Sequence, residues 1–367
     1  MTIDLRQLVF ALVGVQTAFL IVFSAHFFVE PAMIGGNEAL YDHLRERLAV
    51  YDVGPEAYDF QFMNWAYSDA ADYLVGIAGE ETREPFRFRV IYIWLITGLN
   101  GLVSTCETVR SECGLGSVAL VAKLVNWVGI LATFRVIQTI SPDRMAPVTL
   151  ALATAGALNF GTFLTAPFVM ADILCGLVFA LAARFFLTRQ FLALVATVAT
   201  GVLVKEICIV LGVLIAAELL RVDRKPLPLI LIGGAAPLAA FVGIRLAMGS
   251  DPLSLNYGWE VSQGYFEIRY VYLHAEGYFI PFLTKTLFGA GIGALFLLTT
   301  LRHGPRGLEI WTAVAVCLAL MTANLLLASG VVRVAAPLAP LLSVFLLHRG
   351  LYLTRRGGDL ARAPSGG

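Results

Sequence analysis

Long, uninterrupted apolar runs recur along the chain and constrain its fold more than any other feature. The first extends from Leu8 to Val29. A helix needs about 20 apolar residues to cross a bilayer core, which is about 30 Å thick. Further runs lie at roughly 90–106, 117–140, 146–165, 167–187, 190–204, 207–221, 227–247, 280–301, 307–328 and 331–350. The runs predict an all-α fold, a polytopic transmembrane bundle of about 10–12 helices.

The composition excludes most other classes of protein. Hydrophobic residues make up 58% of the chain and charged residues 14%, against about 45–50% and about 25% in soluble domains. The runs are continuous rather than alternating, which excludes a transmembrane β-barrel. The zero net charge gives no support for a nucleic-acid partner. Because no soluble domain is left over, residues 1–367 are predicted to form a single transmembrane domain.

Basic residues in short loops indicate the cytoplasmic side of a membrane protein. They gather in the tail and in three turns: Arg349, Arg355, Arg356 and Arg362; Arg302 and Arg306; Arg221, Arg224 and Lys225; Arg184 and Arg189. Their placement, together with Arg6, predicts outer loops at 30–89 and 248–279 and outer junctions near 165–172 and 205–206. Eleven full crossings would separate the two termini, so one segment within 90–221 is expected to cross incompletely.

The outer loop 30–89 contains twelve of the 26 acidic residues. Two stretches in it show the period of amphipathic helices that lie on a membrane surface. Their apolar stripes are Leu40, Leu44 and Leu48, and Met63, Tyr67, Ala70, Leu74 and Ile77. Asp69 and Asp72 fall on the opposite face of the second helix. They either solvate the loop or point together into a site above the bilayer.

The order Ser68-Asp69-Ala70-Ala71-Asp72-Tyr73, followed by a basic stretch and a helix, resembles the first outer loop of a known family. This family is the GT-C class of integral membrane glycosyltransferases, which includes protein O-mannosyltransferases and lipid A aminoarabinose transferases. Asp69 and Tyr73 match the family's Asp-Glu-x-x-Tyr pattern, and Ala70 stands in place of the Glu. The resemblance implies that Asp69 or Asp72 is the catalytic base.

Further residues match the family in chain order. Arg87 and Arg89 stand where a basic stretch enters the second helix, Asp172 opens a helix after an outer loop, Lys205 and Glu206 close a later helix, and Arg333 precedes Pro337 and Pro340. The resemblance implies that these residues, with Tyr73, bind the substrate. Physical chemistry leaves other roles open for three of them. Lys205 and Glu206 could instead mark a turn at the membrane–water interface, where the free-energy cost of a charged side chain is small. Asp172 could instead balance a helix dipole.

The resemblance implies an enzyme that takes a sugar from a polyprenyl-phosphate donor and transfers it, with inversion, to a lipid, glycan or protein acceptor. Such chemistry needs a base for the acceptor, cations for the leaving phosphate and an apolar groove among membrane lipids for the donor chain. No nucleotide cofactor is implied, and a divalent cation is the one cofactor the resemblance allows. The expected location is the plasma (inner) membrane, with the site facing outward. The alternative is a transporter or flippase for a lipid-linked or polar solute, although the chain shows no internal repeat of the kind many transporters have.

Several other residues have simpler expected roles. Cys106 and Cys113 flank one short loop and are expected to pair if that loop faces outward. Cys175, Cys208 and Cys317 are expected in the core. Lys123, Arg135 and Arg245 are expected to snorkel or pack. The aromatic residues of 250–280 suit either interfacial anchoring or sugar binding.

Overall fold

The structure is a computed structural model of the chain, and it describes residues 73, 76–79, 86–106, 112–159, 162, 165, 166, 169–221, 226–250, 308, 309, 311, 312, 314–316, 319 and 337–348. Every regular element within these residues is a helix, which confirms the all-α prediction. Two helices are long and apolar enough to cross a membrane, Gly116–Gln138 and Leu227–Ala247. The polytopic bundle remains a prediction, because runs such as 8–29 and 280–301 lie outside the described residues.

The described elements follow the predicted runs closely. In chain order they are η2 (Phe86–Phe88), α4 (Val90–Val103), α5 (Glu112–Gln138), α6 (Pro147–Ala157), α8 (Asp172–Leu187), α9 (Phe191–Val204), η3 (Glu206–Leu211), α10 (Gly212–Arg221) and α11 (Leu227–Ala247). A further helix spans Leu338–His348. The agreement arises because each run is bounded by polar or turn-forming residues that end the helix.

The run at 146–165 is an exception, because α6 ends at Ala157 and the prediction of one helix there is wrong. Leu158 leaves the helical conformation with φ −114° and ψ 51°. The Asn159 amide then donates to the Gly156 carbonyl at 3.1 Å, and its oxygen accepts from the Thr162 backbone N–H at 3.1 Å. Such local side-chain bonds give the backbone an alternative to the helical ladder.

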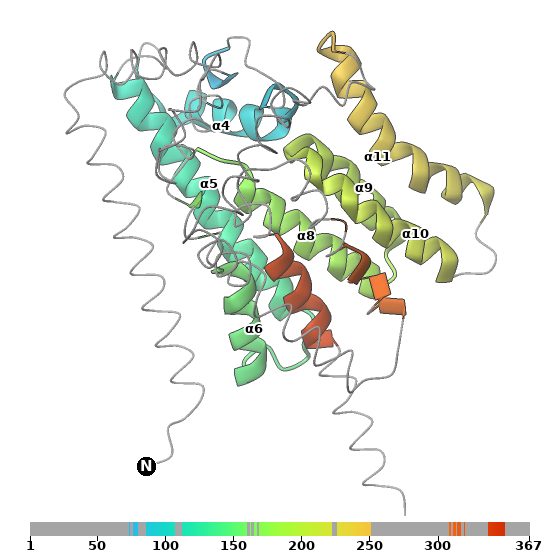
Figure 1. Cartoon of the computed structure of the whole chain (residues 1–367). Helices are drawn as coiled ribbons and strands as arrows, with labels where there is room; N and C mark the ends of the chain where they lie inside the picture. Colours follow the sequence, from blue (N-terminus) through green and yellow to red (C-terminus); the bar gives the residue numbers. More distant parts are fainter. Residues whose placement is uncertain are drawn as a thin grey trace, which may run out of the picture.

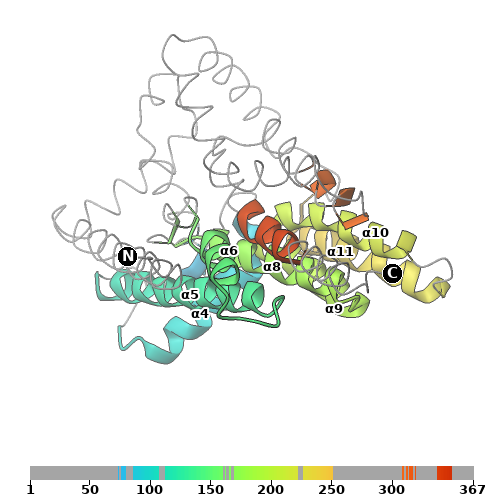
Figure 2. The same cartoon turned by 90° about the horizontal axis from the view of Figure 1, so that it is seen from below.

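The helices pack into a bundle in which α8 is central (Figure 1). Helix α8 contacts α5 on one side and α9 on the other, and α11 covers α9. The main core is built from α8, α9, η3, α10 and the helix Leu338–His348. Figure 2 shows that last helix beside α6 and α8, where Phe345 lies 6.0 Å from Phe186, ring centre to ring centre.

Two glycines mark places where backbones approach closely. A Cβ atom added to Gly156 of α6 would lie 2.5 Å from Ile137 Cδ1 and 2.9 Å from Ser343 Oγ. A Cβ atom added to Gly201 of α9 would lie 2.5 Å from Val178 Cγ1 and 3.1 Å from Cys208 Cβ. Small residues at helix contacts are typical of membrane bundles, in which packing rather than water drives association.

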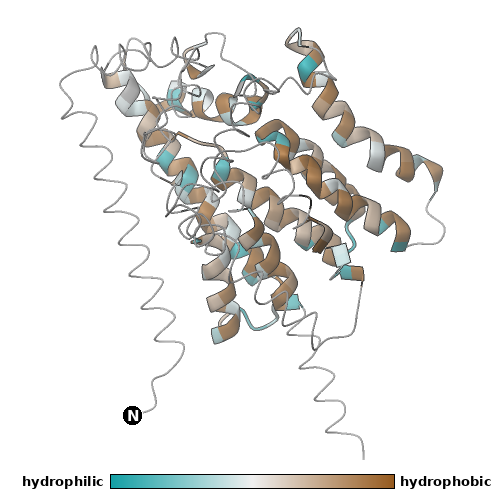
Figure 3. Ribbon diagram, viewed as in Figure 1, coloured by the Kyte–Doolittle hydropathy of each residue, from teal (hydrophilic) through white to brown (hydrophobic). Residues whose placement is uncertain are grey.

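The described helices are hydrophobic along most of their length, as the brown colour of the ribbon in Figure 3 shows, and many of their large apolar side chains are exposed. On α5 they form an exposed stripe: Leu120, Leu124, Val128 and Leu131. On α11 only Gly233, Pro237 and Arg245 are buried. An apolar outer surface of this kind suits a lipid environment rather than water.

Helix α4 lies across the end of the bundle at which α5 begins and α9 ends (Figure 1). It has 14 residues, which span about 21 Å. Its residues Tyr92 and Ile96 pack in one cluster with Val118 and Val125 of α5 and Val204 of α9. Helix α4 therefore contacts only the first half of α5 through this cluster, and does not follow it along its length.

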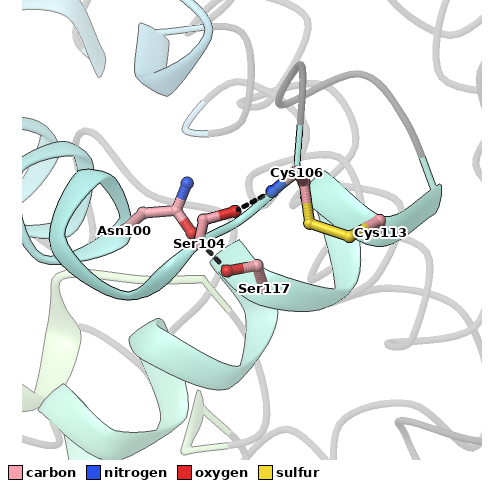
Figure 4. The surroundings of a disulfide bond; sticks show 5 residues. All are labelled: Asn100, Ser104, Cys106, Cys113 and Ser117. Carbon is pink, nitrogen blue, oxygen red and sulfur yellow. Dashed lines mark hydrogen bonds between the residues drawn. A yellow bond between two sulfur atoms is a disulfide. The ribbon is translucent and has the colours of Figure 1, made fainter.

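The predicted pairing of Cys106 and Cys113 is confirmed (Figure 4). Their Cα atoms are 5.7 Å apart. The Ser104 hydroxyl accepts a hydrogen bond from the Cys106 backbone N–H at 3.2 Å, and the Ser117 hydroxyl donates to the Asn100 side-chain oxygen at 2.6 Å. The bridge and these bonds join the end of α4 to the start of α5.

Candidate functional site

Two ion pairs lie side by side at the end of the bundle that α4 covers. The Arg89 guanidinium binds both carboxylate oxygens of Glu206, at 2.7 Å and 3.1 Å. The Lys205 ammonium binds the Asp172 carboxylate at 2.7 Å. All four residues were predicted as substrate-binding residues from the sequence, and the structure brings them together.

The junction between α9 and η3 explains how neighbouring residues serve different pairs. Helix α9 ends at Val204, and Lys205 is extended, with φ −158° and ψ 125°. Consecutive side chains of extended backbone point in opposite directions. Lys205 therefore reaches the first residue of α8, whereas Glu206 reaches the residue that precedes α4.

Tyr73 belongs to the same cluster. Its hydroxyl oxygen accepts a hydrogen bond from Arg89 Nη1 at 2.9 Å, and its ring meets the ring of Tyr92 edge-on at 4.9 Å. Burial raises the pKa of Tyr73 well above its ordinary value, and the Arg89 charge offsets only part of this effect. Tyr73 is therefore a neutral phenol that holds the guanidinium in place.

The four charged groups are largely withdrawn from solvent. The residue exposures of Arg89, Asp172 and Lys205 are 4%, 3% and 6%. Burial opposes ionisation of Glu206, but the charge and hydrogen bonds of Arg89 outweigh it and keep the pKa of this carboxyl below its ordinary value. Buried charges are tolerated when they are paired and hydrogen-bonded in this way.

Arg87 lies apart from the ion pairs, at the end of α11. Its Nη2 donates to the Met248 carbonyl at 3.2 Å, and its guanidinium lies 5.2 Å from the centre of the Phe88 ring. Arg245 lies over the same ring at 4.6 Å and over Phe241 at 3.6 Å, which confirms the expected packing. The sequence did not indicate that Arg245 lies over the same ring as Arg87. The signal available was its place in the last turn before the predicted outer loop 248–279.

A small pocket adjoins Asp172 on the bundle side. Its lining combines polar groups with small or apolar residues: Ile130, Thr133, Gly156, Ala157, Asn159, Thr162, Thr165, Asp172, Ile173, Gly176 and Pro340. Asp172 thus contacts both the ion pair and this small pocket of mixed lining, because it binds Lys205 and also lines the pocket.

Other predicted site residues cannot be placed beside this cluster. Asp69, Asp72 and Arg333 lie outside the described residues, as does Cys317. Cys175 and Cys208 are buried, with their sulfur atoms 3.5 Å apart, as expected of core residues. Among the described residues no group of three or more His, Cys, Asp or Glu side chains is arranged to hold a metal ion.

Comparison with known proteins adds no relative. No family model matches the chain, no curated protein does, and no solved structure does. The geometry of the cluster is therefore the basis for assigning a function.

Proposed function

We propose that the protein is a membrane glycosyltransferase that moves a sugar from a polyprenyl-phosphate donor to an acceptor at the outer face of the membrane. One observation carries the proposal: five residues predicted to bind the substrate meet at one end of the bundle. They are Tyr73, Arg89, Asp172, Lys205 and Glu206. They come from four segments far apart in the sequence, so their meeting is a property of the fold.

The disulfide supports an outward orientation for this end. Disulfides persist in oxidising compartments and are rare in the cytosol. The bridge between Cys106 and Cys113 joins α4 to the start of α5, and α4 lies across the end of the bundle at which α5 begins and α9 ends (Figure 1). The last turns of α5, α8 and α10 carry Arg135, Arg184 and Arg221. Cations at those ends follow the positive-inside rule.

The same geometry accounts for the uneven number of apolar runs. Helix α4 lies across the end of the bundle at which α5 begins and α9 ends (Figure 1), whereas α9, which has the same length, packs alongside α8 and α11. If α4 stays at the outer surface, ten crossings remain and both termini are cytoplasmic. The chain is then a multi-pass protein of the plasma (inner) membrane with its site facing outward.

The chemistry divides among the residues as follows. Asp69 or Asp72, one to four residues before Tyr73, acts as the base that takes the proton from the acceptor hydroxyl. The acceptor oxygen then displaces the lipid phosphate at the sugar carbon, which inverts that carbon. Arg89 and Lys205 supply positive charge for the leaving phosphate, while Glu206 and Asp172 hold these two cations in place.

A transfer assay with radiolabelled polyprenyl-phosphate sugars tests the proposal. Wild-type protein is expected to move label to an acceptor in a membrane extract. Asp69→Asn or Asp72→Asn is expected to lower the rate about a hundredfold or more, as loss of a general base does. Asp143→Asn, an exposed residue at the opposite end of the bundle, is the matched control and should keep the wild-type rate. Full transfer by both loop variants would refute the base assignment, and no transfer by wild type from any donor would refute the enzyme.

A second arm of this assay separates the function of the buried pair from its structural role. Replacing a buried ion pair by apolar residues of similar size is often neutral for stability. Asp172→Leu combined with Lys205→Met is therefore expected to keep a cooperative thermal transition and lose transfer. A variant that is folded and fully active would show that the pair is only structural.

The alternative function, a transporter or flippase for a lipid-linked or polar solute, is favoured by one observation. The helical path is interrupted at Lys205, which is extended between α9 and η3. Many transporters bind their solutes where a transmembrane helix is interrupted in this way. Uptake or lipid translocation in proteoliposomes, without sugar transfer, would establish this alternative.

A further inference from the structure

Two cysteines from distant parts of the chain meet in the main core. The sulfur atoms of Cys175 in α8 and Cys208 in η3 are 3.5 Å apart, and both residues are 0% exposed. The sulfur atoms of a disulfide are about 2.0 Å apart. A movement of about 1.5 Å would therefore bring this pair of thiols to bonding distance.

The thiol pair repeats the spacing of the ion pair beside it. Lys205 binds Asp172 at 2.7 Å, and Cys208 and Cys175 each follow one of these residues by three positions. The separation along the chain is 33 residues in both pairs. The start of α8 and the start of η3 thus contact each other at two successive levels, one made of charges and one made of thiols.

The segment η3 is a short 3₁₀ element between two α-helices. Lys205 is extended before it, and α10 begins directly after it at Gly212. Short 3₁₀ stretches within a helical run often mark a hinge. The segment also carries Glu206, which binds Arg89. The position of η3 against α8 therefore affects both ion pairs.

Helix α9 leaves room for this contact at Gly201. A Cβ atom added there would lie 3.1 Å from Cys208 Cβ and 3.3 Å from Cys208 Sγ. Because glycine has no side chain, Cys208 fits between α9 and α8 with its sulfur beside that of Cys175. The surrounding core is apolar, so the only reactive atoms within reach of either sulfur in this core cluster are those of the other thiol.

We propose that Cys175 and Cys208 are a modification site, at which hydrogen peroxide forms a reversible disulfide that fastens η3 to α8. Because both sulfur atoms are buried, the oxidant has to be a small uncharged molecule rather than a protein oxidoreductase. The bridge would hold Lys205 and Glu206 where they lie in the structure. This modification goes beyond the proposed function and does not depend on it.

Oxidation of the pair proceeds in two steps. One sulfur attacks the peroxide, an S–O bond forms as the O–O bond breaks, and the products are a sulfenic acid and water. The second thiol then attacks that sulfur, an S–S bond forms as the S–O bond breaks, and a second water leaves with the thiol proton. Two thiols are oxidised and one peroxide is reduced. Two equivalents of a small thiol reverse the reaction through a mixed disulfide.

Counting thiols in the full-length protein tests the pairing. Membranes that contain the Cys317→Ser chain are treated with hydrogen peroxide, denatured, and labelled with a maleimide polymer that shifts the gel band. With Cys106 and Cys113 bridged, the two remaining thiols should both be labelled before treatment and neither after it. Peptide mapping should show Cys175 linked to Cys208, and dithiothreitol should remove the link.

A single variant separates pairing from other oxidation. In Cys175→Ala, which keeps a small apolar side chain in the core, Cys208 should retain its label after peroxide because it has no sulfur to pair with. Loss of label in Cys175→Ala equal to that in the parent chain would show oxidation without pairing and overturn the site. Retention of both labels in the parent chain would overturn it as well, and would make the pair a packing contact only.

Hydrogen–deuterium exchange and thermal unfolding test the effect of the bridge on η3. Amides exchange when a segment opens locally, so peptides covering Glu206–Leu211 should exchange about tenfold more slowly after oxidation. The thermal midpoint in detergent should rise by about 5 °C, because the bridge joins residues 33 positions apart. Peroxide should change neither value in Cys175→Ala. A bridge that forms and leaves both values unchanged would overturn the fastening of η3. None of these measurements uses a sugar donor, so they decide the inference whatever the transfer assay shows.

Discussion

At the scale of single residues, four charged side chains form two ion pairs, Arg89 with Glu206 and Lys205 with Asp172. Lys205, Glu206 and Asp172 stand out because charges are rare and costly within apolar runs. Their partners depend on how α8, α9 and α4 meet, which no local pattern encodes. Arg87 and Arg89 are two residues apart, yet one contacts α11 and the other contacts η3.

The Glu206 carboxyl gives the protein a defined acid sensitivity. Its pKa is lower in the folded chain than in the unfolded chain, so its ionised form stabilises the fold. That stability is fully present above the ordinary carboxyl pKa and is lost as the pH falls through the lowered folded-state value. The thermal midpoint of the wild-type protein, followed by tryptophan fluorescence in detergent, is expected to fall as the pH is lowered from 6 to about 3.

Glu206→Gln is the matched variant for this measurement. It should be less stable than wild type at pH 7 and should lose less stability on acidification, because it has no carboxyl to protonate. Asp143→Asn controls for an exposed carboxyl. Parallel pH profiles for wild type and Glu206→Gln would show that this carboxyl does not contribute to the acid sensitivity.

At the scale of elements, apolar period and run length predicted the helices well. Helix α11 coincides with the run at 227–247, and α9 ends one residue before Lys205. The prediction of one helix over 146–165 failed because composition alone does not show that the Asn159 side chain bonds the Gly156 carbonyl and the Thr162 backbone N–H just after α6 ends. The packing of α9 against α8 was equally hidden, since it depends on a glycine contacting a residue 23 positions away.

The contact at Gly201 predicts a strong effect of one methyl group. Gly201→Ala would place a Cβ atom 2.5 Å from Val178 Cγ1 and 3.1 Å from Cys208 Cβ, and overpacking of this kind costs about 1–3 kcal/mol. Gly243→Ala on α11 is the control, because a Cβ there meets nothing within 4 Å. It should be neutral or stabilise by about 0.5–1 kcal/mol. Thermal unfolding in detergent measures both, and equal midpoints would contradict the close packing.

At the scale of the whole molecule, the arrangement of the ends predicts a topology. Thr105 lies next to the disulfide, and Met145 lies in the turn between α5 and α6 at the other end; both are exposed. In a chain with Cys106→Ser and Cys113→Ser, Thr105→Cys should react with a membrane-impermeant maleimide in intact cells. Met145→Cys should react only after the cells are opened.

Two results would contradict the proposed orientation. One is labelling of Met145→Cys in intact cells, which would turn the ion pairs toward the cytoplasm. The other is protection of Thr105→Cys in intact cells together with labelling after lysis, which would place the start of α5 inside. Sequence alone could not assign the loop between α4 and α5 to one side of the membrane, because its side depends on whether α4 crosses the membrane.

The lengths of α8 and α9 have a consequence for the lipid around the protein. With 16 and 14 residues, these helices span about 24 Å and 21 Å, less than a hydrocarbon core of about 30 Å. Hydrophobic mismatch of this size is relieved by thinning of the adjacent leaflet. Acyl chain length is therefore expected to change how closely lipid head groups approach the buried charges. Shorter acyl chains should bring the head groups closer, and thicker, sterol-rich bilayers should keep them farther away.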